Sequence, residues 1–386
     1  MNKYSGVVAC LLLVMLLSAC GKTGTLIPVS LSPSETLLRL NLDENTSNIS
    51  GHLEHYYDQQ SGKELLFSLN TIKNEIQVYD LQQRQLHKSL TFAVEGDRGV
   101  GNISAFYVHN LDSIFLFPRN GNRVFLTDNE AKAIQRINYQ VPDGYGNAIV
   151  SSTYFSAKPY LQNGKLVTKT LYQGNYSTVG NQELSTRHVS YAVDLSTGGV
   201  DNLPATYPND YMADVKKHFQ FSFSASKNGN VYSLWGDHSL YLSKGLNSEW
   251  TRVPARSAYL REQWEALPLG GTRMDRTRYF AASAHYGNII YDPYREVYYR
   301  FVYPKVEVEN DQDLRQLALY PVKFSIMILD KNLNTLGEKF FEESFVTSNV
   351  FVGKEGLYMS INHPNNLDNH EDFLSFQLYQ LNGLPD

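Results

Sequence analysis

Arginine and aromatic side chains are concentrated in one stretch of the chain, from Trp250 to Arg278. The stretch holds six arginines and no lysine against three acidic residues, a local charge of +3 in a chain of net charge −5. Arginine binds carboxylates and phosphates through parallel hydrogen bonds and stacks on aromatic rings. The stretch therefore predicts a surface for an anionic glycan, a peptide carboxylate or a protein partner, made by Arg252, Arg256, Trp264, Arg273, Arg276 and Arg278. The alternative is that these arginines pair with nearby acids at the edges of the fold.

A glycine-rich loop, Glu95–Gly101, is the second feature that suggests ligand binding. A phosphate cradle of this kind needs a following helix whose N–H groups point at the anion, but the residues after Gly101 are strand-like. We therefore expect Gly99 and Gly101 to permit a tight crossover between strands. The alternative is that they lie on a ligand-binding face.

Catalytic and metal-binding patterns are weak. In His52-Leu-Glu-His55 the two histidines are three residues apart, whereas the zinc-binding helix of metalloproteases needs a spacing of four. No Gly-x-Ser-x-Gly elbow is present. The neighbouring acids Glu342 and Glu343 fit a solvated strand edge better than a glycosidase pair. The sequence thus gives no reason to expect a cofactor or a metal.

The first twenty residues indicate the compartment. Lys3 precedes the apolar run Gly6–Leu17, which ends at Leu17-Ser-Ala-Cys20. A basic start, a short apolar run and small residues at a cleavage site are typical of a secretory signal peptide. The run of 12 residues is shorter than the roughly 20 that span a bilayer. Leu-Ser-Ala-Cys also resembles the lipobox of bacterial lipoproteins, which implies cleavage before Cys20 and acylation of that cysteine.

These features divide the chain into three parts. We predict a signal peptide over residues 1–19, a lipidated Cys20 with a small, polar tether over 20–33, and one domain over 34–386. Cys10 leaves with the signal peptide and Cys20 carries lipid, so no thiol is left for a disulfide or a thiolate metal site. The modest negative charge gives no attraction to nucleic acid, so no nucleic-acid partner is expected.

Strand-like segments separated by short polar turns dominate the predicted domain. An apolar strand that ends in Asp recurs at positions 80, 128, 194, 292 and 330, and weaker members of the repeat lie near 243 and 379. Taken in order, the seven positions are separated by steps of 48, 66, 49, 49, 38 and 49. Repeats of about 40–50 residues are typical of four-stranded β-propeller blades. Seven positions predict an all-β, seven-bladed propeller of antiparallel blades, with six blades as the alternative.

Three local expectations follow from this architecture. The recurring Asp should cap backbone N–H groups in the turn between the two outer strands of a blade. The run Thr36–Leu42 should add a strand that closes the ring. The best helix candidate is Ala258–Ala266, where Tyr259 and Trp264 share a face with Leu267.

The stretch Glu95–Leu116, together with the lipobox, resembles an uncharacterised family of Bacteroidota β-propeller lipoproteins. The resemblance implies a propeller in which a glycine-rich turn leads from the outer strand of one blade to the inner strand of the next. It brings no catalytic residue with it. The segment Gly21–Gly24 lacks the acidic residues associated with surface export, so the resemblance implies the periplasmic face of the outer membrane, with the cell surface as the alternative.

Two functions agree with these observations. The first is a non-enzymatic binding or scaffold module of the cell envelope, anchored to the membrane through Cys20, with a glycan, peptide or protein partner. The second is a hydrolase or lyase that acts on envelope glycans through acidic residues gathered at the propeller axis. Fold alone does not separate them, because propellers host many activities.

Overall fold

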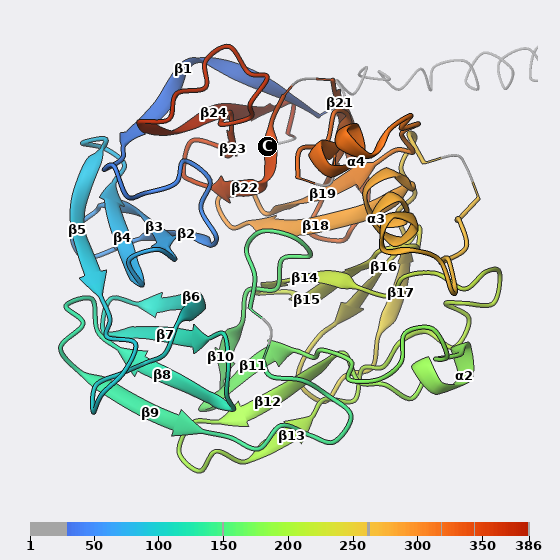
Figure 1. The fold of residues 1–386 in the computed structure, drawn as a ribbon, viewed down its shortest axis with the longest axis horizontal. Coiled ribbons are helices and arrows are strands. Elements are labelled where there is room, and N and C mark those ends of the chain that lie inside the picture. Colours follow the sequence, from blue (N-terminus) through green and yellow to red (C-terminus); the bar gives the residue numbers. More distant parts are fainter. Residues whose placement is uncertain (1–28, 149, 261–262, 318, 343, 385–386) are drawn as a thin grey trace, which may run out of the picture.

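Six four-stranded antiparallel sheets form a ring around a central axis (Figure 1). The structure is a computed structural model that describes residues 29–148, 150–260, 263–317, 319–342 and 344–384. In five sheets the first strand in the sequence lies nearest the axis, and in the sixth the inner strand is β22 (Val346–Val352). The predicted all-β propeller with antiparallel four-stranded blades is confirmed, but the prediction of seven blades was wrong: there are six.

The blades follow one another along the chain. Blade 1 comprises β2 (Leu53–Tyr57), β3 (Glu64–Asn70), β4 (Glu75–Asp80) and β5 (Gln85–Thr91). Blade 2 comprises β6 (Ile103–Asn110), β7 (Ser113–Pro118), β8 (Arg123–Thr127) and β9 (Ile134–Asn138). Blade 3 comprises β10 (Tyr160–Gln162), β11 (Lys165–Lys169), β12 (Ser190–Asp194) and β13 (Val200–Asn202).

The second half of the ring has the same plan. Blade 4 comprises β14 (Phe221–Ser226), β15 (Gly229–Leu234), β16 (Ser239–Ser243) and β17 (Thr251–Pro254). Blade 5 comprises β18 (His285–Asp292), β19 (Val297–Tyr303), β20 (Phe324–Leu329) and β21 (Thr335–Phe341). Blade 6 comprises β22 (Val346–Val352), β23 (Leu357–Ser360), β24 (Phe373–Asn382) and, as its outer strand, β1 (Ser30–Asn41).

The miscount of blades has a local cause. Asp292 and Asp330 are counted as two repeats in the sequence pattern, but both belong to blade 5. Asp330 follows the third strand, where the expected turn lies, and its carboxylate accepts hydrogen bonds from the N–H groups of Asn332 and Asn334. Asp292 ends the first strand and caps the inner turn in the same way, through the N–H groups of Tyr294 and Arg295. The same turn chemistry at two places in one blade therefore imitates an extra repeat.

The turn-capping role predicted for Asp holds in other blades. Asp128 accepts from the N–H groups of Glu130 and Lys132 after β8. Asp194 accepts from the N–H groups of Ser196 and Thr197 after β12. Because these turns join the two outer strands, they confirm the expected position of the repeated residue.

Among the described residues, three helices lie outside the blades: α2 (Asn181–Leu184), α3 (Arg273–Ala282) and α4 (Asp311–Leu317). The predicted helix Ala258–Ala266 was wrong, since residues 258–260 and 263–266 adopt no helix. Helix α3 begins instead after Thr272, which exchanges side-chain and backbone hydrogen bonds with Asp275 in a capping box. Within the described ranges, no helix has the length and apolar character needed to cross a membrane.

The N-terminal strand closes the ring. β1 pairs antiparallel with β24, with Leu40 opposite Leu374, and completes blade 6. This confirms the closing strand predicted at Thr36–Leu42. The strand begins earlier, at Ser30, so residues 30–33 of the predicted tether belong to the blade.

The hydrophobic core is divided among the contacts between blades. Six large clusters of buried side chains each fill the space between two neighbouring blades. The cluster between blades 6 and 1 contains Leu38 and Leu40 of β1 together with Leu53 and Leu66 of blade 1. Because one sheet has two apolar faces, each blade depends on both neighbours.

We expect Leu40→Ala to lower the free energy of unfolding by about 2–5 kcal/mol, since Leu40 is fully buried at the closing contact. Urea denaturation followed by tryptophan fluorescence measures the change. The matched control is Glu35→Ala on the same strand, which is exposed and should change stability by about 0.5 kcal/mol or less. Equal effects of the two substitutions would show that β1 does not close the ring.

Candidate functional site

Arg252 on β17 is engaged in two ion pairs, one with an acid of blade 4 and one with an acid of the connection between blades 3 and 4. Its guanidinium contacts the carboxylate oxygens of Asp210 at 2.6 Å and Asp237 at 3.1 Å, and its Nε donates to the hydroxyl of Ser239. The guanidinium also lies over the ring of Tyr241, 5.6 Å from its centroid. These contacts give Arg252 a structural role at the outer edge of the blade.

The other predicted residues lie apart from Arg252. The ring of Trp264 packs against His238, with centroids 4.8 Å apart, at the core between blades 4 and 5. Arg256 is exposed after β17. On α3, Nη1 of Arg276 donates to the carbonyl of Gly271 and Nη1 of Arg278 donates to the carbonyl of Val308.

The structure therefore does not gather these residues into one site. Successive helical residues are turned by about 100°, which places Arg276 and Arg278 on opposite sides of α3. Arg278 faces α4, 4.0 Å from Asp311, and Arg273 is exposed. Anion binding by the exposed Arg273 and Arg276 stays a prediction, but a single arginine-rich pocket is not formed.

Gly99 and Gly101 make the crossover from β5 to β6. A Cβ atom on Gly99 would lie 2.6 Å from the carbonyl carbon of Glu95, so the turn accepts only glycine. Gly101 has a φ of +78°, a conformation that glycine adopts without strain. These contacts support the crossover role rather than a place on a binding face.

Residues 151–159, here called the axial segment, cross the centre of the ring between blades 2 and 3 (Figure 1). The hydroxyl of Ser152 accepts from the N–H of Leu53 on β2. The carbonyl of Ser156 accepts from the N–H of Phe223 on β14, and the N–H of Ser156 donates to Oδ1 of Asn288 on β18, both at 2.9 Å. Three inner strands thus hold the segment, and two cavities follow one another along β18 beside it.

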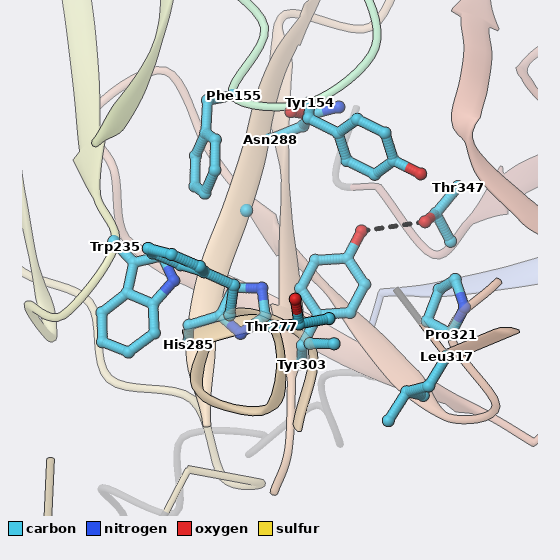
Figure 2. A pocket seen from close by; sticks show the side chains of 13 residues that line it. Tyr154, Phe155, Trp235, Thr277, His285, Asn288, Tyr303, Leu317, Pro321 and Thr347 are labelled. Carbon is cyan, nitrogen blue, oxygen red and sulfur yellow. Dashed lines mark hydrogen bonds between the residues drawn. The ribbon is translucent and has the colours of Figure 1, made fainter. Parts of the chain in front are cut away.

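The first cavity, here called the aromatic cavity, has a volume of about 320 Å³. It lies between the axial segment, β18 and the helices α3 and α4 (Figure 2). Its lining residues are mostly apolar and come from distant parts of the chain: Tyr154, Phe155, Trp235, Thr277, Phe280, Ala281, His285, Gly287, Asn288, Tyr303, Leu317, Pro321 and Thr347. Volume and lining are typical of a small-molecule or side-chain pocket.

One wall of the aromatic cavity is a stack of rings. Trp235 lies between Tyr279 and His285, with centroid distances of 5.0 and 5.4 Å, and His285 in turn stacks on Tyr303 at 4.8 Å. The hydroxyl of Tyr303 donates to the hydroxyl oxygen of Thr347 at 3.0 Å (Figure 2). The inner faces of these rings cover one another, so the stack borders the cavity with apolar ring edges on side chains that are already fixed.

His285 supplies a polar atom without supplying charge. Burial lowers the pKa of its imidazole to about 4, so the ring is neutral at pH 7. Nδ1 lies 2.8 Å from the carbonyl oxygen of Ser283, which only accepts, so Nδ1 carries the hydrogen. Nε2 is then a hydrogen-bond acceptor in the neutral ring.

A buried lysine lies behind the cavity. Lys169 Nζ donates to the carbonyl of Phe221 and lies 5.8 Å from the ring centroid of Phe155. Burial lowers the pKa of Lys169 to about 7. Burial, reinforced by Lys169, lowers the pKa of His218 to about 3. His218 and His285 are therefore both uncharged at neutral pH, and the surroundings of the cavity favour an uncharged ligand group.

The second cavity, here called the Glu54 cavity, has a volume of about 420 Å³. Glu54 and Lys158 line it together with His52, and the ammonium lies 3.4 Å from the carboxylate. Glu54 is the one carboxylate among the residues that line the two axial cavities in the described part of the chain. Glycosidases use a pair of carboxyl groups, so this geometry does not favour the hydrolase alternative.

Across the described ranges, no three His, Cys, Asp or Glu side chains converge as metal ligands would. Sequence reasoning missed both axial cavities. The aromatic cavity is assembled from regions spread between Tyr154 and Thr347, and of its members only Thr277 belongs to the stretch singled out for its arginines. His52 and Glu54 are two residues apart, and residues at this spacing share a face in extended backbone. The spacing could therefore have predicted that the two side chains meet. The zinc-site pattern does not detect this, because it describes the spacing on a helix.

Comparison with known proteins agrees with this fold. A family profile described as a domain of unknown function (DUF4221) matches residues 28–340. The crystal structure of a DUF4221 member from Bacteroides vulgatus is similar over 92% of this chain and 98% of its own, with a TM-score of 0.82 and 23% sequence identity. A structure from Bacteroides fragilis is similar over 93% and 96%, with a TM-score of 0.50 and 12% identity. None of the curated proteins matches the sequence.

We expect His285→Gln to weaken the acid sensitivity of the protein. The ordinary imidazole pKa is 6.5 and that of folded His285 is about 4, so between these values only the unfolded chain binds the proton. The free energy of unfolding therefore falls as pH decreases from 6.5 to 4, by up to about 1.4 kcal/mol per pH unit for one histidine. Urea denaturation at several pH values should show this slope reduced in the variant, and an unchanged slope would contradict a neutral, buried His285.

Proposed function

The chain belongs to the DUF4221 family, as the resemblance over Glu95–Leu116 indicated, and we propose that it is a lipid-anchored binding module of the cell envelope that receives an apolar side chain of a peptide or protein partner in the aromatic cavity. The observation that carries the proposal is the stack of Tyr279, Trp235, His285 and Tyr303 beside the axis. Such a wall gains free energy by covering a ring or a branched aliphatic group and excluding water from it.

The polar groups of the cavity support the same ligand class. They are few, and Asn288 is already bonded to the axial segment on both sides of its amide. An ionic group would lose its hydration in this cavity without gaining a partner. An uncharged apolar group has no such hydration to lose. If this ligand group carries an N–H or O–H, the imidazole of His285 can accept its hydrogen bond.

The rim of the cavity supports a partner larger than the cavity itself. Tyr154, Phe280 and Leu319 are large apolar residues with 47%, 41% and 56% of their surface exposed. Tyr154 and Phe280 line the cavity, and the hydroxyl of Tyr154 donates to the carbonyl of Leu319. Exposed apolar side chains grouped around a pocket are typical of protein interaction sites. A peptide or protein partner is therefore favoured over a free glycan at this cavity.

The anchor is a proposal from sequence. Residues 1–28, including Cys20 and the signal peptide, lie outside the described residues. β1 begins at Ser30 on the outer edge of blade 6. A short tether from an acylated Cys20 would thus reach the propeller at its rim and leave the axis free. We place the protein at the periplasmic face of the outer membrane, with the cell surface as the alternative.

Filling the aromatic cavity should weaken the binding of an apolar ring. Thr277→Trp adds a large side chain at a lining position of α3, whereas Arg276→Trp adds the same side chain at an exposed position one residue earlier. With 5-fluoroindole as the probe, fluorine NMR should show saturable binding to the wild type, binding weakened about tenfold or more in Thr277→Trp, and unchanged binding in Arg276→Trp. Equal binding to all three proteins, or no binding to the wild type, would contradict the proposal.

The lipid anchor has its own test. In the native host, a clickable palmitate analogue should label the wild type and not Cys20→Ser, and the variant should move from the membrane fraction to the soluble fraction. Ser18→Thr, in the signal peptide, is the control and should remain labelled. Labelling that persists in Cys20→Ser would exclude this cysteine as the acylated residue.

A further inference from the structure

Glu54 is a buried carboxylate with one oxygen left unpaired. It lies on β2 at the axis, and its side chain is only 3% exposed. Oε2 accepts a hydrogen bond from the N–H of Val108 at 2.8 Å, whereas Oε1 has no hydrogen-bond partner within the described chain. Because buried polar atoms in proteins are nearly always bonded, the unpaired Oε1 beside this cavity calls for a donor that the described chain does not supply.

The carboxylate is charged, and its counter-charge reaches the same cavity. Burial alone would raise the pKa of Glu54, but Lys158, His52 and the N–H of Val108 outweigh burial and lower the pKa. Lys158 Nζ lies 3.4 Å from Oε2, and half of the lysine side chain is exposed. An ammonium has three hydrogens to donate, so Lys158 keeps donors for a second acceptor beside Glu54.

His52 adds unused hydrogen-bonding capacity at the same point of the wall. Its Nε2 lies 3.6 Å from Oε1 of Glu54, longer than a hydrogen bond. Neither ring nitrogen has a hydrogen-bond partner among the residues described. The ring is held edge to face against Phe106, with centroids 4.6 Å apart.

Serine hydroxyls and an aromatic face complete the lining. Ser152 Oγ accepts from the N–H of Leu53, and Ser224 Oγ accepts from the N–H of Tyr291, so each hydroxyl still has its hydrogen to donate. The ring of Tyr107 lines the cavity too. The Glu54 cavity therefore combines several hydrogen-bonding groups with an apolar ring, in contrast to the aromatic cavity.

The charges of Glu54 and Lys158 restrict the ligand. A cation is attracted by Glu54 and repelled by Lys158, whereas an anion is attracted by Lys158 and repelled by Glu54. The two charges together therefore give neither kind of ion a net electrostatic attraction. A hydroxyl group satisfies both, because its hydrogen is donated to the carboxylate and its oxygen accepts from the ammonium. We propose that the Glu54 cavity is a binding site for a neutral hydroxylated ligand, a sugar ring or a related polyol, held between Glu54 and Lys158.

This site is separate from the aromatic cavity of the proposed function, and either can fail without the other. The probes are glucose, galactose, mannose and N-acetylglucosamine, each observed by saturation-transfer NMR with the full chain. We expect at least one to bind the wild type. Its binding should weaken by about tenfold or more in Glu54→Gln and in Lys158→Met, since each variant removes a charge-assisted hydrogen bond. The methyl glycoside and a disaccharide of that sugar distinguish a free sugar from the end of a glycan.

Two control variants accompany the experiment. Lys165→Met removes a lysine that pairs with Asp201 in blade 3 and should leave sugar binding unchanged. Thr277→Trp blocks the aromatic cavity and should also leave it unchanged, while Lys158→Met should still bind 5-fluoroindole. If Glu54→Gln does not fold, sugar binding by Lys158→Met decides the result, because the side chain of Lys158 is half exposed. The proposal is overturned if no probe binds the wild type, if both variants bind as the wild type does, or if only a peptide probe, N-acetylalanine N-methylamide, binds.

Discussion

Coverage of both faces of every blade is the constraint on which this structure depends. Each four-stranded sheet is apolar on two sides, and six clusters of buried side chains fill the spaces between neighbours. Five of those contacts form between blades that are adjacent in sequence. The sixth joins the two ends of the chain and is completed by Leu38 and Leu40 of β1. The ring therefore closes only when the N-terminal strand pairs with β24, which makes the most distant pairing in the sequence the one that secures the rest.

A buried arginine links this framework to the aromatic cavity. Arg300 on β19 is fully buried and donates to the carbonyl oxygens of Asp237 and Ala255 and to the hydroxyl of Ser233, while its guanidinium lies 3.3 Å from the ring centroid of Tyr286. Burial lowers the pKa of Arg300 to about 10, which still leaves it charged. The guanidinium thus satisfies the backbone that follows Trp235 and fixes blade 4 against blade 5. Its partners Ser233 and Asp237 lie on either side of Trp235 in the sequence, so these hydrogen bonds hold the backbone that carries this ring of the stack.

The axial segment gives the two ends of the axis different chemistry. Its Tyr154 and Phe155 face the aromatic cavity, whereas Ser152 and Lys158 face the Glu54 cavity. A short irregular stretch of backbone at the axis remains stable because inner strands on three sides supply its hydrogen bonds. One insertion between blades 2 and 3 therefore lines both axial cavities.

The sequence by itself determined the blade type, the turn chemistry and the closing strand, because strand periodicity, Asp-capped turns and apolar alternation act over a few neighbouring residues. It did not determine the blade number, since Asp292 and Asp330 give the same local signal from one blade. Only the tertiary structure decided the sites. The ring stack joins Trp235, His285 and Tyr303 across blades 4 and 5, and Glu54 meets Lys158 from more than a hundred residues away. Arginines that are close in sequence are separated by a helix that turns about 100° per residue, whereas residues far apart converge because every inner strand of a propeller borders the same axis.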